Sequence, residues 1–100
     1  MIDLSGKKAL VTGASRGIGA AIAQSLDAAG AQVLLNSRNV ADIERVAAGL
    51  SNNPQLLAAD LAPSGAGTAL AERVIAEHGG VDILINNAGI AMRRTPQELT

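Results

Sequence analysis

The chain has 100 residues, of which 48% are hydrophobic and 17% are charged, and its formal net charge is −1. This composition is typical of a globular domain, and the nearly balanced charge argues against a nucleic-acid surface. The chain contains no Cys, Phe, Trp or Tyr, which excludes disulfides, cysteine metal ligands and a thiol nucleophile, and we predict no metal site. Residues 1–6 lack the pattern of a signal peptide and the apolar stretches are shorter than a membrane span, so we expect a cytoplasmic protein without a membrane partner.

Strand-type and helix-type patterns alternate along the chain, which predicts βαβ units and a parallel sheet. In chain order we expect a strand at 8–12, a helix at 17–29, a strand at 32–36, a helix at 40–50, a strand at 55–59, a helix that enters through 63–67 and ends near 78, and a strand at 81–86. The predicted fold class is α/β, with a doubly wound parallel sheet of strand order 3-2-1-4.

Two of these predicted elements have a distinct apolar pattern. The helix at 17–29 places Ile18, Ile22 and Leu26 at i, i+4 and i+8, which predicts that they share one face. The strand at 81–86 is almost continuously apolar, which fits a strand covered on both faces.

The end of the sequence looks incomplete for such a fold. Residues 95–98, Thr-Pro-Gln-Glu, have the N-cap and first-turn residues of a further helix, although the chain ends two residues later. The strand at 81–86 would lie at the edge of the sheet with an unpaired outer edge, which favours aggregation or swapping. We therefore expect a domain that is completed by further sequence or by another chain.

The run at 12–19, Thr-Gly-Ala-Ser-Arg-Gly-Ile-Gly, joins the first strand to the first helix. Glycines there let backbone N–H groups approach a ligand, and the positive end of the helix dipole is directed at the same place. The spacing Gly-x-x-x-Gly-x-Gly differs from the Gly-x-Gly-x-x-Gly fingerprint, and no P-loop lysine follows. We predict a pyrophosphate site at Gly13, Gly17 and Gly19; the alternative is an ordinary glycine loop and helix cap.

The end of the second predicted strand indicates which dinucleotide would bind. A fold that prefers NAD usually has Asp or Glu about 20 residues beyond the glycines, where it holds the ribose 2′-hydroxyl. Residues 36–39 are Asn-Ser-Arg-Asn, without an acid. Arg38 is suited to a phosphate, and Arg16 in the glycine run reaches the same region. We therefore predict NADP, with NAD as the alternative; in that case both arginines are surface residues.

Two more segments follow strands at the edge where such sheets bind ligands. Asp60 follows the third strand, and its carboxylate either accepts a hydrogen bond from the adenine amine or stabilises a turn. Residues 86–89, Asn-Asn-Ala-Gly, follow the fourth strand. The asparagine amides tie loops together or contact a ribose, and Ala88 and Gly89 leave room for a cofactor. The alternative for this segment is a simple turn.

With the glycine run, Asp60 and residues 86–89 in this order, the chain resembles the N-terminal part of a short-chain dehydrogenase/reductase. This resemblance covers residues 6–100, and the run at 12–19 is also similar to that of 3-oxoacyl-(acyl-carrier-protein) reductases and tropinone-reductase-like members. The resemblance implies an incomplete Rossmann-like doubly wound sheet, with residues 1–100 as the N-terminal portion of a single NAD(P)-binding domain. It also implies hydride transfer between the nicotinamide cofactor and a carbonyl or alcohol substrate.

The resemblance further implies cofactor contacts from each of these segments. Residues of the glycine run would wrap the pyrophosphate and the adjacent ribose: Gly13, Ser15, Arg16, Gly17, Ile18 and Gly19. The other implied contacts are Arg38 with the 2′-phosphate, Asp60 and the Leu61 backbone with adenine, and Asn87, Ala88 and Gly89 with the ribose side. Asn86 would brace the fourth strand against the first.

The resemblance provides no catalytic residue within this chain. The Ser, Tyr and Lys that family members use for catalysis lie downstream of position 100, and this chain has no tyrosine. We expect residues 1–100 alone to lack catalysis and to act on a substrate only with the remaining half. The alternative is a non-catalytic nucleotide-binding or protein-interaction module that self-associates through the edge of the fourth strand. A third interpretation is a fragment that does not fold alone.

Overall fold

The computed structural model describes residues 2–15 and 17–87. In these ranges strands and helices alternate in chain order: β1 (Lys8–Val11), α1 (Gly17–Ala28), β2 (Gln32–Ser37), α2 (Val40–Ala47), β3 (Gln55–Ala58), α3 (Ala66–His78) and β4 (Ile83–Ile85). None of the helices in this part of the chain is both long enough and apolar enough to span a bilayer.

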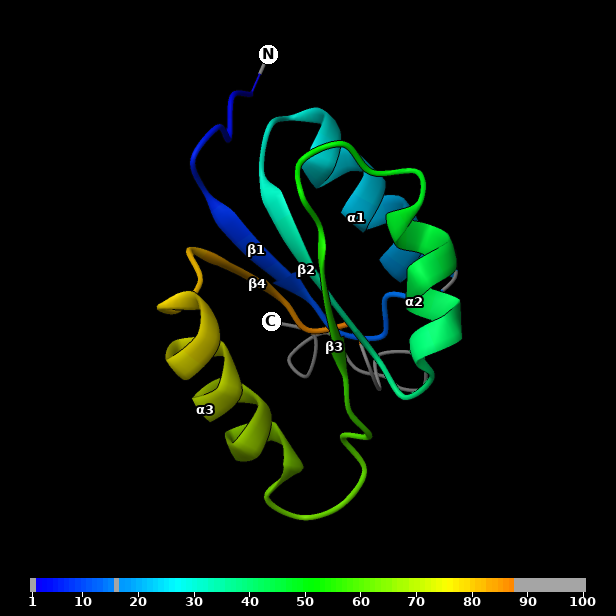
Figure 1. Ribbon diagram of the computed structural model, residues 1–100, viewed down its shortest axis with the longest axis vertical. Helices are drawn as coiled ribbons and strands as arrows, with labels where there is room; N and C mark the ends of the chain where they lie inside the picture. Colours follow the sequence, from blue (N-terminus) through cyan, green and yellow to red (C-terminus); the bar gives the residue numbers. More distant parts are fainter. Residues whose placement is uncertain (1, 16, 88–100) are drawn as a thin grey trace, which may run out of the picture.

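The strands form one parallel sheet in the order β3-β2-β1-β4, which confirms the predicted α/β fold class and strand order. The chain moves outward from β1 through β2 to β3 and then crosses back to pair β4 with the other side of β1. This reversal places α1 and α2 on one face of the sheet and α3 on the other (Figure 1). The fold is therefore doubly wound and Rossmann-like, with its topological switch beside β1.

The side chains of β2 explain why both faces of the sheet are covered. Successive residues of a strand point to opposite faces. Val33 and Leu35 pack against Ile43 of α2, whereas Leu34 between them packs against Leu70 of α3. All three β2 residues are 0% exposed, so this strand is the centre of two separate apolar layers.

The apolar face predicted for α1 is only partly correct. Ile22 and Leu26 pack against the core, but Ile18 is 69% exposed. The buried face passes instead through Gly19 and Ala23. Neighbouring residues point about 100° apart around a helix, so a helix that is docked through Gly19 turns Ile18 toward the outside.

The prediction that the fourth strand is covered on both faces is wrong. Leu84 is 61% exposed, although its partner Leu10 in β1 is buried beside α3. In the part of the chain that is described, β4 is an edge strand that pairs only with β1. The helix α3 packs against residues of β1, β2 and β3 and leaves Leu84 outside this apolar layer. The helix start predicted at 95–98 lies outside the described residues.

The predicted helix at 40–50 is also too long, since α2 ends at Ala47. Leu50 nevertheless packs against the core from the loop that follows. An apolar residue can therefore lie in the interior although it is outside the helix. The strand β4 is two residues shorter at its start than predicted and one shorter at its end.

Candidate functional site

A cleft of about 430 Å³ opens at the edge of the sheet where the strands end. Three chain segments meet there because the carboxyl ends of parallel strands share one edge. They are the loop after β1, the end of β2 with its following loop, and the loop after β3. The residues that line the cleft are Gly13, Ser15, Asn36, Ser37, Arg38, Ala59, Asp60, Leu61 and Ala62.

The structure brings together part of the predicted cofactor site. The predicted residues that line the cleft are Gly13, Ser15, Arg38, Asp60 and Leu61. Those that are described but lie outside the lining are Gly17, Ile18, Gly19 and Asn87. Those outside the described residues are Arg16, Ala88 and Gly89. Segments that are far apart in sequence thus meet as predicted, while the binding role of each residue stays a prediction.

The glycine loop has the backbone shape that its sequence suggests. Gly13 and Gly17 have positive φ angles of 62° and 60°, which residues other than glycine rarely adopt. A Cβ atom at Gly17 would meet no atom of the described residues within 4 Å, so these residues leave the surface at the start of α1 open. The first turn of α1 carries no acidic side chain, and the helix dipole there favours an anion.

The loop after β1 is bonded to the loop after β4. Asn87 Nδ2 donates to the Gly13 carbonyl at 3.0 Å, and Asn87 N donates to Thr12 Oγ1 at 2.9 Å. A Cβ atom at Gly19 would lie 2.2 Å from the Gly13 oxygen and 2.7 Å from Asn87 Nδ2. This close packing within the protein itself requires glycine at position 19.

A second contact joins the same two loops. Thr12 Oγ1 donates to Asn86 Oδ1 at 3.2 Å, which confirms that Asn86 braces the fourth strand against the first.

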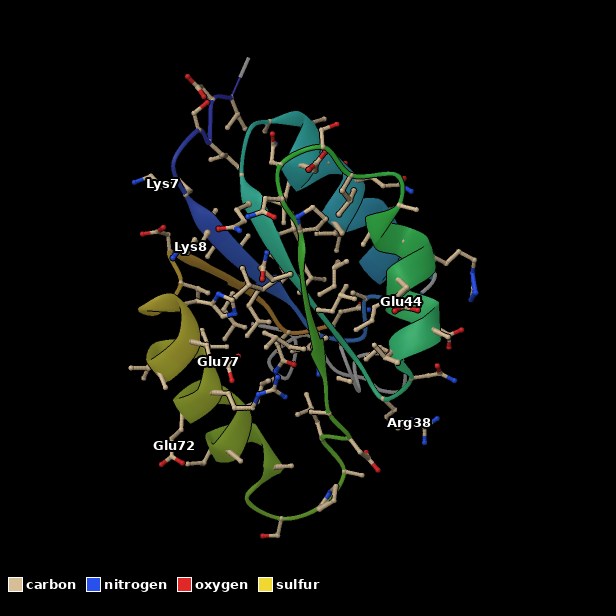
Figure 2. The ribbon with its side chains drawn as sticks, viewed as in Figure 1. Lys7, Lys8, Arg38, Glu44, Glu72 and Glu77 are labelled. Carbon is tan, nitrogen blue, oxygen red and sulfur yellow. The ribbon has the colours of Figure 1, made fainter. Side chains whose placement is uncertain are left out.

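Arg38 lies in a short connection between β2, which ends at Ser37, and α2, which begins at Val40. The next residue, Asn39, caps α2, because its Oδ1 accepts a hydrogen bond from Ala41 N at 2.9 Å. Arg38 is exposed and belongs to none of the ion pairs formed by the described residues. Figure 2 shows its side chain extending outward at the carboxyl end of β2. Its guanidinium is therefore exposed to solvent beside the cleft.

Asp60 has both a structural role and capacity for a ligand. Its Oδ1 accepts a hydrogen bond from Ala62 N at 3.0 Å, so the turn considered in the sequence analysis is present. The side chain is nevertheless exposed and lines the cleft. A carboxylate has about four acceptor positions on its two oxygens, and this turn occupies one of them. The remaining positions are available to a ligand amine.

Asn36 is a cleft residue that sequence reasoning did not single out. It is 1% exposed, and its Nδ2 donates to the Leu57 carbonyl at 2.9 Å and to the Ala59 carbonyl at 3.3 Å. The available signal was a polar residue directly after the apolar run 33–35. A polar residue at that position indicates that its side chain needs hydrogen-bond partners, but the sequence does not identify the carbonyl groups that the amide would contact.

Comparison with known proteins agrees with this geometry. Residues 7–100 match the family model described as short chain dehydrogenase. "Nodulation protein G" of Rhizobium sp. (strain N33) is 49% identical over 90 residues, which cover 90% of this chain and 37% of the relative. A metagenomic short-chain oxidoreductase in complex with NADP has a TM-score of 0.76 and 44% identity, covering 95% of this chain and 47% of that one. L-sorbose reductase from Gluconobacter frateurii, complexed with NADPH and L-sorbose, has a TM-score of 0.78 and 37% identity, and the match covers 99% of this chain and 39% of the reductase.

The chain spans less than half the length of the relatives that it matches, from 37% of the nodulation protein to 47% of the metagenomic oxidoreductase. Within that span the sequence match is nearly continuous, since the family model covers residues 7–100. The solved structures share the fold of this chain, with TM-scores of 0.76 and 0.78. The chain therefore belongs to the short chain dehydrogenase family.

Proposed function

We propose that the chain is the NADP-binding part of an oxidoreductase that transfers hydride between NADP(H) and a carbonyl or alcohol substrate. One observation carries this proposal: the cleft places the glycine loop next to the ends of β2 and β3, with Arg38 and no carboxylate in the loop that follows β2. An acid in that region would favour NAD by holding the ribose 2′-hydroxyl. An exposed arginine favours the 2′-phosphate of NADP, because a guanidinium pairs with a phosphate through two parallel hydrogen bonds.

The residues present fit such a cofactor. The open start of α1 at Gly17 would hold the pyrophosphate, since backbone N–H groups and the helix dipole both favour an anion there. Asp60 would accept a hydrogen bond from the adenine amine with an oxygen that its turn does not use. Ser15 and Leu61 line the same cleft and would complete the adenosine side of the site.

Similar proteins support NADP over NAD. The metagenomic oxidoreductase named above is described in complex with NADP, and the sorbose reductase with NADPH. Both are more than 30% identical to this chain. We extend this cofactor to the present chain because its own Arg38 has the charge that a 2′-phosphate requires.

The chemistry is divided between the cofactor and the rest of the protein. NADPH, when bound, supplies the hydride. The residues of this chain bind the cofactor and orient it, and we assign none of them a catalytic role. The carbonyl or alcohol substrate, the activity of the whole protein and its location in the cytoplasm stay proposals.

Titration calorimetry on the 100-residue chain tests the proposed function. We expect NADP⁺ to bind at least about tenfold more tightly than NAD⁺, because a charge-assisted pair with a phosphate contributes about 1.5–3 kcal/mol. We expect no turnover of NADPH with a carbonyl substrate by this chain alone. Equal affinity for the two nucleotides, or a preference for NAD⁺, would contradict the assignment of Arg38.

The outer edge of β4 favours a second property, self-association. β4 pairs only with β1 among the described residues, and Leu84 is 61% exposed. Unpaired apolar edge strands tend to pair with another chain. We expect dimers in light scattering after gel filtration, and we expect Leu84→Lys to shift the chain toward monomer. An unaltered chain that stays monomeric at high concentration would argue against self-association through the edge of β4.

A further inference from the structure

Asn36 occupies an unusual place for a polar side chain. It follows the buried apolar residues of β2 and is itself 1% exposed. Its Nδ2 donates to two carbonyl groups of the neighbouring chain segment, Leu57 at 2.9 Å and Ala59 at 3.3 Å. A buried amide without such partners would be strongly destabilising. Together with the backbone hydrogen bond from Ala59 N to the Ser37 carbonyl at 2.9 Å, these bonds hold the exit of β3 against β2.

The same residue also contacts the third wall of the cleft. Its backbone carbonyl accepts a hydrogen bond from Ala14 N at 2.9 Å. Ala14 lies in the glycine loop between two residues that line the cleft, Gly13 and Ser15. One residue therefore joins all three segments that form the cleft: the glycine loop, the end of β2 and the loop after β3.

We propose that Asn36 is a positioning residue for nucleotide recognition, whose side-chain amide holds the Asp60 wall of the cleft at a set distance from the Arg38 wall. This inference rests on the proposed function. A nucleotide with a 2′-phosphate would contact both walls at once, through the phosphate at Arg38 and the adenine at Asp60. Its affinity thus depends on the spacing of the walls, whereas NAD⁺ would use only the Asp60 wall on this side.

Of the amide, hydroxyl, aliphatic and carboxylate side-chain groups, only an amide can hold both carbonyl groups. One nitrogen with two N–H groups can donate to both carbonyls, which neither a hydroxyl nor an aliphatic side chain can do. A carboxylate would place an oxygen against two carbonyl oxygens, so Asp cannot replace Asn36 in this position. Changing the spacing by about 1 Å would misalign groups that must contact one ligand together.

Asn52 offers a matched control. Its Nδ2 also donates to two carbonyls of other segments, Asp27 at 2.7 Å and Ala31 at 3.3 Å. It lies at the opposite edge of the sheet, in the loop before β3, and it does not line the cleft. The variants Asn36→Ala and Asn52→Ala therefore remove the same kind of bridge at two places, only one of which adjoins the nucleotide.

The test compares nucleotide preference in the two variants by calorimetry. For Asn36→Ala we expect the Kd for NADP⁺ to rise about tenfold, and the ratio of NADP⁺ to NAD⁺ affinity to fall at least about threefold. For Asn52→Ala we expect a loss of thermal stability with an unchanged ratio. An unchanged ratio in Asn36→Ala, or an equal fall in Asn52→Ala, overturns the inference. Absence of NADP⁺ binding by the unaltered chain would instead overturn the proposed function, and this inference with it.

A second measurement does not depend on whether Asn36→Ala folds. In NMR spectra of the unaltered chain, we expect the side-chain amide protons of Asn36 to exchange slowly with solvent. The chemical shifts of these protons should change on titration with 2′,5′-ADP, a nucleotide that carries both the adenine and the 2′-phosphate, while those of the Asn52 amide protons stay constant. Rapid exchange, or equal shifts at Asn36 and Asn52, would refute the positioning role.

Discussion

Replacing Gly19 with alanine tests how α1 is docked against the loop that follows β1. A Cβ atom at this position would lie 2.2 Å from the Gly13 carbonyl oxygen and 2.7 Å from Asn87 Nδ2. Both distances are far below van der Waals contact, and the nearer atom belongs to the backbone. The helix or the loop must therefore move, and the Asn87–Gly13 hydrogen bond of 3.0 Å must lengthen or break.

The magnitude follows from opposing effects. Alanine is favoured over glycine within a helix by about 0.5–1 kcal/mol. Forcing an extra carbon into close packing costs about 1–3 kcal/mol, and a lost hydrogen bond costs about 0.5–1.5 kcal/mol. The clash outweighs the gain, so we expect the free energy of unfolding to fall by about 1–3 kcal/mol in Gly19→Ala. For a domain of this size, each kcal/mol lowers the Tm by about 4–8 °C.

Urea denaturation followed by circular dichroism provides the assay, and Gly67→Ala provides the control. Gly67 is also a helical glycine, in α3, but a Cβ atom there would meet nothing within 4 Å. We expect Gly67→Ala to raise the free energy of unfolding by about 0.5 kcal/mol. If Gly19→Ala is stabilised to the same extent as Gly67→Ala, the close approach of α1 to Gly13 is not as described, and the reasoning fails.

Two further substitutions test the cleft and the opposite edge of the sheet. Arg38→Ala should weaken NADP⁺ binding about tenfold or more and leave NAD⁺ binding nearly unchanged in calorimetry. Arg45→Ala removes the same charge from α2 outside the cleft and should alter the binding of neither nucleotide. Equal effects of the two substitutions would refute a phosphate contact at Arg38. Gly30→Ala should lower the free energy of unfolding by about 1–3 kcal/mol, because Gly30 has a φ of 106° and a Cβ there would lie 2.8 Å from Ser5 Oγ. Gly49→Ala, where the nearest atom would be at 3.7 Å, should change urea stability little, and a comparable loss would show that space at Gly30 is not the cause.

The alternation of patterns along the chain was sufficient to predict the order of strands and helices. Apolar runs such as 33–35 mark strands because a strand that is covered on both faces needs apolar side chains in succession. The predicted order 3-2-1-4 is the usual order of these strands in a doubly wound sheet. The prediction for Leu84 failed because an apolar run shows that burial would be favourable, but not that an element is present to cover it.

The candidate site was predictable where a single residue type has a backbone or charge requirement. Gly13 and Gly17 were recognisable because positive φ angles favour glycine, and Arg38 because its charge stands where an acid is usual. The role of Gly19 was less predictable, since its close neighbours are Gly13 and Asn87 rather than a ligand. The contacts of Asp60 were left open because an aspartate after a strand can serve a turn, a ligand or both.

The sequence by itself determined the fold class and the edge of the sheet at which the loops gather, and it predicted a contact with a phosphate rather than a hydroxyl at the end of β2. These depend on local periodicity, glycine content and charge, which neighbouring residues specify together. Only the tertiary structure decided that Asn36 joins the walls of the cleft and that Gly19 is packed against Gly13. Such contacts join segments from different elements, and their geometry depends on how whole strands and helices pack, which no short stretch of sequence encodes.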